Sequence, residues 1–314
     1  MRINSFIETG KFYKGNLHLH TTKSDGALSP EDTVAAYKEK GYDFLSITDH
    51  RIWNSDTSYG GDDMLIIPGT EIDGSFVKEF CGKENWACHH LVVIDPGEGF
   101  EGVPFEHEQR FESANDPDGK KVYSNLMDII KGRRAIAIYC HPGWSRVELE
   151  DMLPLDGCFS LELYNNGCYF EGNCADALNY WDSLLRRGIK VFGVAVDDNH
   201  PVYTIGGGWV CVKAASLSQK DVISSLLSGS FYASTGPEIY DFYVENGVAH
   251  LECSPCRKIH FAQYNMPGKS SWNENGSLIT KGEYKLRENQ FQYVRVECED
   301  EFGKRAWTNP IILK

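Results

Sequence analysis

Residues 16–26 decide the fold and read Asn16-Leu17-His18-Leu19-His20-Thr21-Thr22-Lys23-Ser24-Asp25-Gly26. A β-strand over residues 16–20 would place His18 and His20 on one face and the two leucines on the other, because side chains alternate along a strand. Two neutral imidazoles on one face can bind a single metal ion. Asp25, which precedes a turn-forming glycine, adds an oxygen ligand. The stretch therefore predicts one side of a metal site, with surface histidines as the alternative.

Length, charge and hydropathy set the broad class of the protein. The chain has 314 residues and is 41% hydrophobic, so we expect one large domain, or a large domain and a small one. A formal net charge of -14 argues against binding to polymeric nucleic acid, whose phosphates need a basic surface. No apolar run is as long as a membrane span, and the first residues lack the apolar core of a signal peptide. We therefore expect a cytoplasmic protein with no membrane partner.

The ten cysteines indicate reduced thiols rather than a disulfide scaffold, because many of them lie in apolar segments. The one Cys-x-x-Cys motif, Cys253 to Cys256, encloses Ser-Pro and has no second pair at the spacing of a zinc ribbon. We interpret this motif as a turn, with a metal or redox site as the alternative.

Short apolar segments alternate with helical patterns over the first 236 residues, which predicts an α/β fold with a parallel barrel or a doubly wound sheet. Helix signals include Ser29-Pro30 at one start and Gly41 at its end, and Ser218 at another start and Gly229 at its end. The expected strands are 43–48, 64–68, 90–94, 135–140, 159–164, 190–196 and 209–213. The other expected helices are 123–131 and 174–187. The polar segment from Asp95 to about Asp118 is interpreted as a long loop or insertion.

From Glu238 onward the hydrophobic period changes to two, which predicts a small antiparallel β-sandwich. The expected strands are 241–244, 248–253, 258–264, 282–287 and 293–298. We place the boundary near Gly236-Pro237, which gives a barrel over residues 1–236 and a sandwich over residues 237–314. A strand-rich extension packed on the barrel is the alternative.

Nine ionisable residues follow or flank the expected strands, where a parallel barrel places its chemistry. They are His18, His20, Asp25, His50, Glu71, His90, His141, Asp198 and His200. Burying so many ionisable groups near one point is costly unless cations neutralise the carboxylates and use the imidazole lone pairs.

These motifs resemble the polymerase and histidinol phosphatase (PHP) family of metal-dependent phosphoesterases. The matching pieces occur in family order and are His18-Leu19-His20, Ser24-Asp25-Gly26, Thr48-Asp49-His50, Pro68-Gly69-Thr70-Glu71, His90, His141-Pro142 and Asp198-Asn199-His200. The resemblance implies a distorted seven-stranded (β/α) barrel with two or three divalent ions of zinc, manganese or iron. Residues 229–237 and 305–310 look like the PHP branch that has a C-terminal β-sandwich and includes carbaryl-hydrolase-like members.

The resemblance also implies a role for each ligand. His18, His20, Glu71 and Asp198 would bind the first ion. Glu71 would bridge to a second ion bound by His90 and His141, and the third would be bound by Asp25, His50 and His200. His89 competes with His90, and we favour His90 because it directly precedes the apolar strand.

The function expected is hydrolysis of a small phosphomonoester, of the nucleotide or sugar phosphate type, by metal-activated water, with phosphate as product. Hydrolysis of a carboxylic ester, carbamate or amide at the same metals is the first alternative, and a non-catalytic accessory module is the second. We expect Glu71, His200 and Arg51 to take part in catalysis. The candidate contacts for a small anionic substrate are Arg51, Lys23, Trp144, Arg146 and Asn165, with solvated loop or turn residues as the alternative. The C-terminal region can cover the barrel mouth, form a homo-oligomer or bind carbohydrate.

Overall fold

The computed structural model describes residues 2–98, 100, 118–264, 266–287 and 293–313. The first strands after the N-terminal segment are β2 (Lys11–Asn16), β3 (Phe44–Ile47), β4 (Leu65–Phe80), β5 (Lys83–Ile94), β6 (Ile136–Tyr139), β7 (Cys158–Asn165), β8 (Phe192–Val196), β9 (Trp209–Ala214) and β10 (Phe231–Ser234). The helices are α1 (Pro30–Glu39), α2 (Gly119–Gly132), α3 (Leu149–Met152), α4 (Asn166–Gly172), α5 (Leu178–Arg186) and α6 (Gln219–Ser228). The remaining strands are β1 (Arg2–Asn4), β11 (Ile239–Glu245), β12 (Val248–Cys256), β13 (Lys258–Gln263), β14 (Met266–Ser271), β15 (Ile279–Lys285), β16 (Tyr293–Glu299), β17 (Arg305–Thr308) and β18 (Ile311–Ile312).

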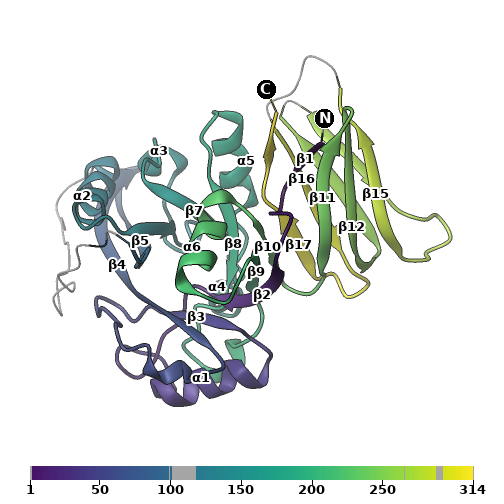
Figure 1. The fold of residues 1–314 in the computed structure, drawn as a ribbon. Coiled ribbons are helices and arrows are strands. Elements are labelled where there is room, and N and C mark those ends of the chain that lie inside the picture. The colour runs from purple at the N-terminus through teal and green to yellow at the C-terminus, as the bar shows by residue number, and fades with distance from the viewer. Residues whose placement is uncertain (1, 99, 101–117, 265, 288–292, 314) are drawn as a thin grey trace.

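Two sheets organise the described residues (Figure 1). The longer sheet has the strand order β14-β13-β16-β17-β10-β9-β2-β3-β4-β5-β6-β7-β8, and the shorter one has the order β1-β11-β12-β15. In Figure 1 the helices surround the strands that precede β11, and the C-terminal strands form a part of their own. The α/β class predicted from the alternation is confirmed as a mixed α/β fold.

The helix signals in the sequence are confirmed at α1 and α6. The Ser29 side chain accepts a hydrogen bond from the backbone N–H of Asp32, and Ser218 does the same for Asp221, so each serine satisfies a free donor at a helix start. Gly229 ends α6 with a φ of 81°, a left-handed conformation that glycine adopts without strain. The start of α1 and both ends of α6 are therefore fixed by local hydrogen bonds and backbone conformation.

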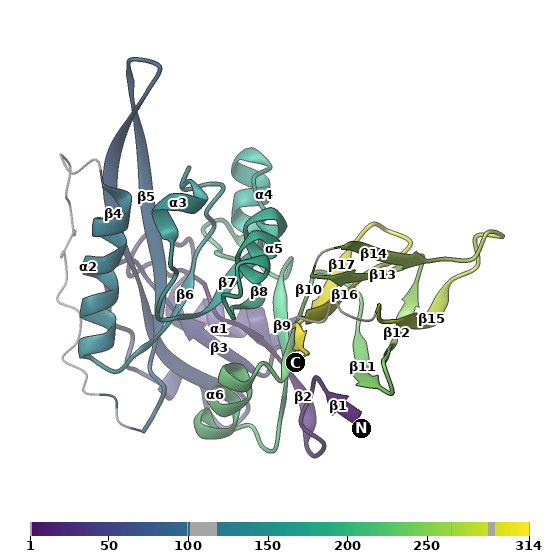
Figure 2. The ribbon, with the colours of Figure 1, turned by 90° about the horizontal axis from the view of Figure 1, so that it is seen from above.

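The longer sheet is mixed rather than parallel, because antiparallel pairs occur around β5, between β2 and β9, and from β9 onward through β10 to β17. β2, β3 and β4 pair in parallel, as do β6, β7 and β8, but β5 is antiparallel to both of its neighbours. The turn between β4 and β5 consists of Cys81 and Gly82, which have φ values of 53° and 72°. A two-residue turn with positive φ at both positions joins antiparallel strands. The resulting hairpin projects well beyond its neighbours (Figure 2).

The strand predicted over residues 16–20 lies earlier in the chain than expected, because β2 begins at Lys11 and ends at Asn16. The backbone of the next residues is satisfied from other loops: Leu19 N–H donates to Thr48 Oγ1 at 3.1 Å, and the His18 carbonyl accepts from Asp198 N–H at 2.9 Å. The prediction of a regular strand was therefore wrong for residues 17–20. Leucines and histidines nevertheless alternate over residues 17–20 and are all buried, although this segment forms no regular β-strand.

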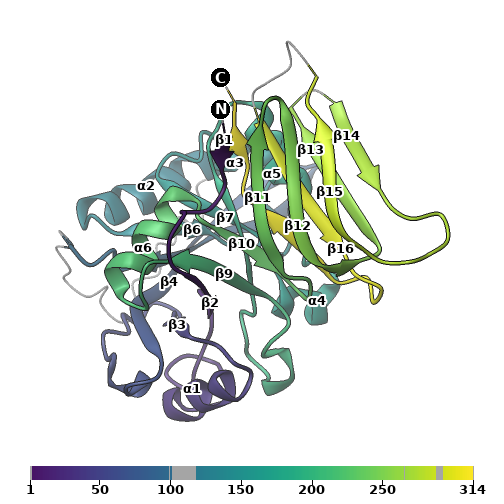
Figure 3. The ribbon, with the colours of Figure 1, turned by 45° about the vertical axis from the view of Figure 1, so that its right-hand side comes forward.

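The C-terminal strands enclose an apolar core between two sheets. Its buried members come from both sheets and include Phe242, Leu251, Phe261 and Val296. The N-terminal strand β1 adds to this part by pairing with β11, and the purple N-terminal segment can be followed to it in Figure 3. The longer sheet continues through the β10–β17 ladder, so backbone hydrogen bonds connect the two parts.

Of two further sequence predictions, one is wrong and the other falls outside the described residues. The turn predicted at Cys253–Cys256 is wrong, because both cysteines lie within β12, where the register with β15 shifts. The long loop predicted from Asp95 to about Asp118 lies almost entirely outside the described residues. None of the helices in the described ranges has the length and apolar character needed to cross a bilayer.

A buried ion pair also connects the two parts. Arg295 of β16, only 3% exposed, makes a bidentate contact with Asp182 of α5 at 2.8–2.9 Å. The substitution Asp182→Ala should lower the free energy of unfolding by about 2 kcal/mol, because it leaves a buried guanidinium without its carboxylate. Urea denaturation measures the change.

The exposed pair between Lys281 and Glu252 provides the control. Glu252→Ala should change the free energy of unfolding by no more than about 0.5 kcal/mol, since solvent screens that pair. Equal effects of the two substitutions would contradict the assigned role of the buried pair.

Candidate metal centre

The nine residues singled out in the sequence meet at one place. They come from the segment after β2, the ends of β3, β6 and β8, and from β4 and β5 themselves. Glu71 and His90 lie inside strands rather than beyond them, because β4 and β5 continue past the site as the long hairpin. Most of the nine side chains are buried, and Asp25, His50 and His200 are the more exposed ones.

The buried Glu71 carboxylate lies at the centre of this cluster. Its Oε2 atom lies 2.9 Å from His50 Nδ1, 3.2 Å from His18 Nε2 and 3.3 Å from His20 Nε2. The two imidazoles of His18 and His20 are close to one another, with their Nε2 atoms 3.1 Å apart. One carboxylate oxygen therefore faces three ring nitrogens.

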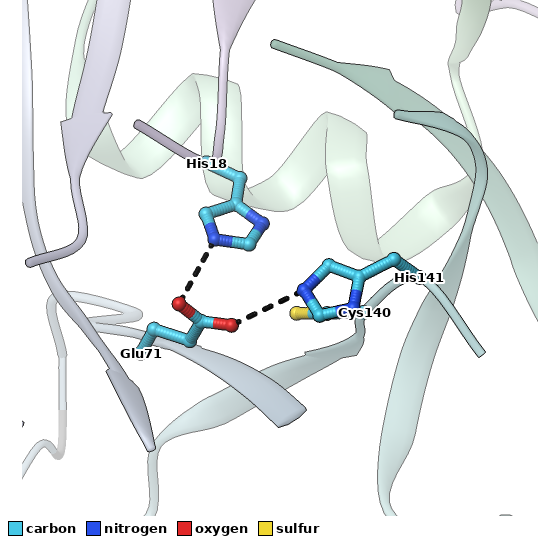
Figure 4. Close-up of side chains that lie close together, drawn as sticks. All are labelled: His18, Glu71, Cys140 and His141. Carbon is cyan, nitrogen blue, oxygen red and sulfur yellow. Dashed lines mark ion pairs between the residues drawn. The ribbon is translucent and has the colours of Figure 1, made fainter. Parts of the chain in front are cut away.

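The other oxygen of Glu71 faces a different pair of histidines. Oε1 lies 2.7 Å from His90 Nδ1 and 3.4 Å from His141 Nε2. Figure 4 shows Glu71 between His18 and His141, with the Cys140 thiol beside His141. Burial raises the pKa of Cys140 well above its usual range, so its sulfur is a protonated thiol rather than a thiolate ligand in the metal-free protein. Glu71 is thus placed to contact two sites at once.

Asp198 completes the inner group, and Asp25 belongs to an outer one. Asp198 Oδ1 lies 2.9 Å from His20 Nε2 and 3.2 Å from His18 Nε2. Asp25 lies 3.4 Å from His200 and 3.6 Å from His50, and half of its side chain is exposed. The inner group is buried, whereas the outer group is more exposed to solvent.

A cavity of about 220 Å³ opens over this cluster. Seven of the nine residues line it, and His18 and His20 lie beneath. The other lining residues are Trp144, Cys168 and Glu171. The cavity can accommodate ions and one small polar group.

The donor atoms fit divalent metal ions. Glu71 Oε2, Asp198 Oδ1 and His50 Nδ1 are buried, and none of them makes a hydrogen bond within the described part of the chain. Buried polar atoms normally find a partner, and these atoms lie close together without hydrogen-bond alignment, as atoms directed at a shared ion do. A set of imidazole nitrogens and carboxylate oxygens suits zinc, manganese or iron.

The electrostatics of the cluster favour charge pairing in the absence of metal. Burial lowers the pKa of His20, but the Asp198 and Glu71 carboxylates outweigh burial and raise that pKa to about 9. Burial would raise the pKa of Glu71, and the imidazoles of His50, His18 and His90 instead hold it well below its usual range. Metal ions must therefore displace protons from imidazoles when they bind.

Glu162 of β7 supports the cluster and was missed in the sequence. Its Oε1 atom lies 2.6 Å from His18 Nδ1, and Oε2 accepts hydrogen bonds from His141 N–H at 2.9 Å and Asn165 Nδ2 at 3.0 Å. A carboxylate on the far nitrogen fixes the orientation of a ligand imidazole. The sequence signal that could have identified Glu162 is a charged residue between Leu161 and Leu163 in an otherwise apolar strand.

The two histidines in β5 lie on opposite faces of the sheet. His90 contacts Glu71, whereas His89 points to the other face of the sheet, where it contacts the Tyr139 hydroxyl at 2.5 Å and the Gly119 carbonyl at 2.8 Å. Burial lowers the pKa of His89 to about 4. His89 is therefore a neutral core residue.

The predicted substrate contacts are dispersed. Trp144 lines the cavity and donates to Glu171 at 2.6 Å, and Arg146 lines an adjoining cleft. Arg51 pairs with Asp73 at 2.6 Å, and Lys23 donates to Asn54 at 3.1 Å. Asn165 is buried behind the cluster, where its amide donates to Glu162 and to Asp198 at 3.0 Å. Trp144 is thus the one of the five that lines the cavity.

One solved structure matches nearly the whole chain. It is a two-domain protein from Bacteroides vulgatus ATCC 8482, described as containing a predicted PHP-like metal-dependent phosphoesterase. The match covers 98% of this chain and 97% of that one, with a TM-score of 0.51 and 13% sequence identity. The two share the PHP-like fold. The resemblance read from the motifs is therefore confirmed at the level of the fold.

Other comparisons with this chain are more limited. A stretch of 44 residues is 50% identical to the DNA polymerase/3'-5' exonuclease PolX of Bacillus subtilis (strain 168), and it covers 14% of this chain and 8% of that protein. An amidohydrolase from Chromobacterium violaceum with bound sulfate and no metal covers 60% of this chain and 87% of its own, at 16% identity and a TM-score of 0.38. No family model matches the chain.

The Glu162 contacts generate a test of how the ligands are held. Glu162→Gln removes the charge that orients His18, so the affinity for Mn²⁺ or Zn²⁺ should fall by about 10- to 100-fold. Competition with a chelator measures this affinity. Glu283→Gln is the matched control, because Glu283 pairs with His250 at 3.1 Å far from the cluster and should leave metal affinity unchanged.

A second test follows from the raised pKa of His20. A folded-state pKa of about 9, above the ordinary value of 6.5, means that the protonated imidazole stabilises the metal-free fold fully below pH 6.5. That contribution is lost as pH rises through 9. The urea midpoint of chelator-treated protein should therefore fall between pH 6.5 and 9, whereas saturating Mn²⁺ should remove the fall. A midpoint of metal-free protein that increases across this window would refute the assignment.

Proposed function

We propose that the protein is a metal-dependent hydrolase that cleaves a small phosphomonoester of the nucleotide or sugar phosphate type. The observation that carries the proposal is the central carboxylate of Glu71, with two oxygens facing two separate sets of imidazoles at the base of a cavity. The shared fold with a PHP-like protein supports the same reading. Paired ions near one another are the usual device for hydrolysis of phosphate esters.

The proposed ligand sets follow the groups of donor atoms. His18, His20, Glu71 and Asp198 bind the first ion, and their ligand atoms lie within 4.8 Å of one another. Glu71 Oε1 joins His90 and His141 at the second ion. The third group, around Asp25, His50 and His200, has its donor atoms within the same limit when His20 is included. Once bound, divalent ions at this site supply a water nucleophile near neutral pH and positive charge for the phosphoryl oxygens.

The chain's own residues have distinct roles in this proposal. Glu71 positions the first two ions relative to one another. His200, one of the more exposed ligands, donates its Nδ1–H to the Asp198 carbonyl at 3.1 Å, which leaves its Nε2, 3.4 Å from Asp25, as the nitrogen that would bind the third ion beside the substrate. Arg51 is a positioning residue here, because its guanidinium is paired with Asp73.

The space beside the cavity favours a substrate that extends beyond its phosphate. A cleft of about 650 Å³ shares Trp144 and Glu171 with the metal cavity and is also lined by Trp86 and Arg146. The Arg146 guanidinium has no ion-pair partner among the described residues. In a protein of net charge -14, this cation gives the cleft a local preference for anionic substrates.

The wider architecture is part of the proposal. We infer a distorted barrel over residues 1–236 that carries the chemistry and a β-sandwich over residues 237–314. The parallel ladders on both sides of the β4–β5 hairpin and the core shared by two C-terminal sheets support this division. A cytoplasmic location is supported by the cysteines, which are all free thiols.

The deciding experiment compares two substrates with the same leaving group. Protein loaded with Mn²⁺, Zn²⁺ or Fe²⁺ is assayed with p-nitrophenyl phosphate and with p-nitrophenyl acetate, so that only the bond cleaved differs. We expect phosphate release from the first substrate. Loss of a residue that only orients a metal ligand typically costs about 10- to 100-fold, so the loss of Glu71, a proposed direct ligand, should lower kcat/KM by more than about 100-fold in Glu71→Ala. Metal content of both proteins is measured in parallel.

The control variant Glu283→Gln should retain full turnover. Cleavage of the acetate alone would replace the phosphoesterase with an esterase or amidase at the same metals. A metal-loaded protein that cleaves neither substrate would favour the non-catalytic accessory module and refute the proposal.

A further inference from the structure

A second cleft, separate from the metal cavity, has a volume of about 500 Å³. It lies between α4, the 201–207 loop and the turn that joins β16 to β17. Helix α4 separates the two sites: Cys168 and Glu171 line the metal cavity, whereas Tyr169 and Phe170 line the cleft. The cleft is therefore built from both the N-terminal and the C-terminal parts of the chain.

Exposed aromatic side chains gather at this cleft. The exposed fractions are 49% for Tyr169, 51% for Phe170, 68% for Tyr203 and 81% for Phe302. The Phe170 ring contacts the Tyr169 and Tyr203 rings, with centroids 5.3 and 5.1 Å apart. Aromatic surface that remains exposed and contiguous on a folded protein marks a binding site.

The polar groups of the cleft have unused hydrogen-bonding capacity. The side chains of Asn173 and Lys304 make no hydrogen bond or ion pair with the described part of the chain. Asp176 and Arg305 lie 3.9 Å apart, beyond hydrogen-bond distance, and both are partly exposed. Donors and acceptors of both signs therefore alternate with the aromatic rings, and the cleft has no strong excess of one charge.

This combination matches one class of ligand. A pyranose ring presents apolar C–H faces, which pack on aromatic rings, and hydroxyl groups, which hydrogen-bond to amide, carboxylate, ammonium and guanidinium groups. A purely apolar partner would leave the polar groups unpaired, and a strongly charged ligand would meet the opposite charges of Asp176 and Arg305 together. We propose that the cleft between α4 and the β16–β17 turn binds a neutral oligosaccharide. The proposal does not depend on the reaction at the metal centre.

Calorimetric titration with cellohexaose, maltohexaose, xylohexaose and mannohexaose tests this site. We expect at least one hexasaccharide to bind with a Kd of about 1 mM or tighter. Tyr203→Ala and Phe302→Ala should each weaken that binding by about tenfold or more, and both side chains are too exposed for their loss to unfold the protein. Binding is the readout, so the result is independent of hydrolase activity.

Trp272→Ala is the matched control, because Trp272 is 59% exposed between β14 and β15 and does not line the cleft. It should leave hexasaccharide binding unchanged. The proposal is overturned if none of the four sugars binds, or if binding survives both cleft substitutions. It is also overturned if sedimentation shows a dimer that Tyr203→Ala converts to a monomer, since the cleft would then be an interface between copies.

Discussion

The burial of the Glu71 and Asp198 carboxylates among imidazoles is the constraint on which the rest of the site depends. Moving one isolated carboxylate into an apolar interior costs several kcal/mol even after relaxation. Here Glu71 has five ring nitrogens within 3.4 Å, and they come from four separate segments of the chain. The charges are therefore tolerated only when all these segments meet, which couples the metal site to the folding of the strands around it.

Two other buried carboxylates hold the segments that carry the ligands. Asp197 accepts hydrogen bonds from three successive backbone N–H groups, those of residues 206–208. Burial raises the pKa of Asp197 to about 6, although these hydrogen bonds act to lower it. Asp49 accepts from the backbone and hydroxyl of Thr21 and from Ser24. Each thus fixes a loop next to a ligand pair and leaves the imidazoles themselves free to face an ion. Glu162 combines both functions, because it contacts the ring of one ligand, His18, and the backbone of another, His141.

Much of the site could be predicted from the sequence, because its ligands lie beside short apolar strands that pattern alone identifies. His50, His141 and Asp198 are examples. Glu162 could not be assigned in the same way, since its role depends on the pairing of β6 with β7, which brings His141 over it. The β4–β5 hairpin was missed for a local reason. A turn of this type favours Asn-Gly, and Cys81-Gly82 gives a weak signal although both residues adopt the required positive φ.

Contacts between distant parts of the chain were the least predictable, and they decide how the two parts work together. The pairing of β1 with β11 joins residues about 240 positions apart, and no local pattern encodes it. The β10–β17 ladder and the Arg295–Asp182 contact add a backbone and a side-chain connection. Because these connections cross the predicted boundary near Gly236, the C-terminal strands are held in register with the strands that precede it. The aromatic cleft is therefore held at a fixed position beside α4, and the short helix that forms one wall of the metal cavity is also a wall of the second site.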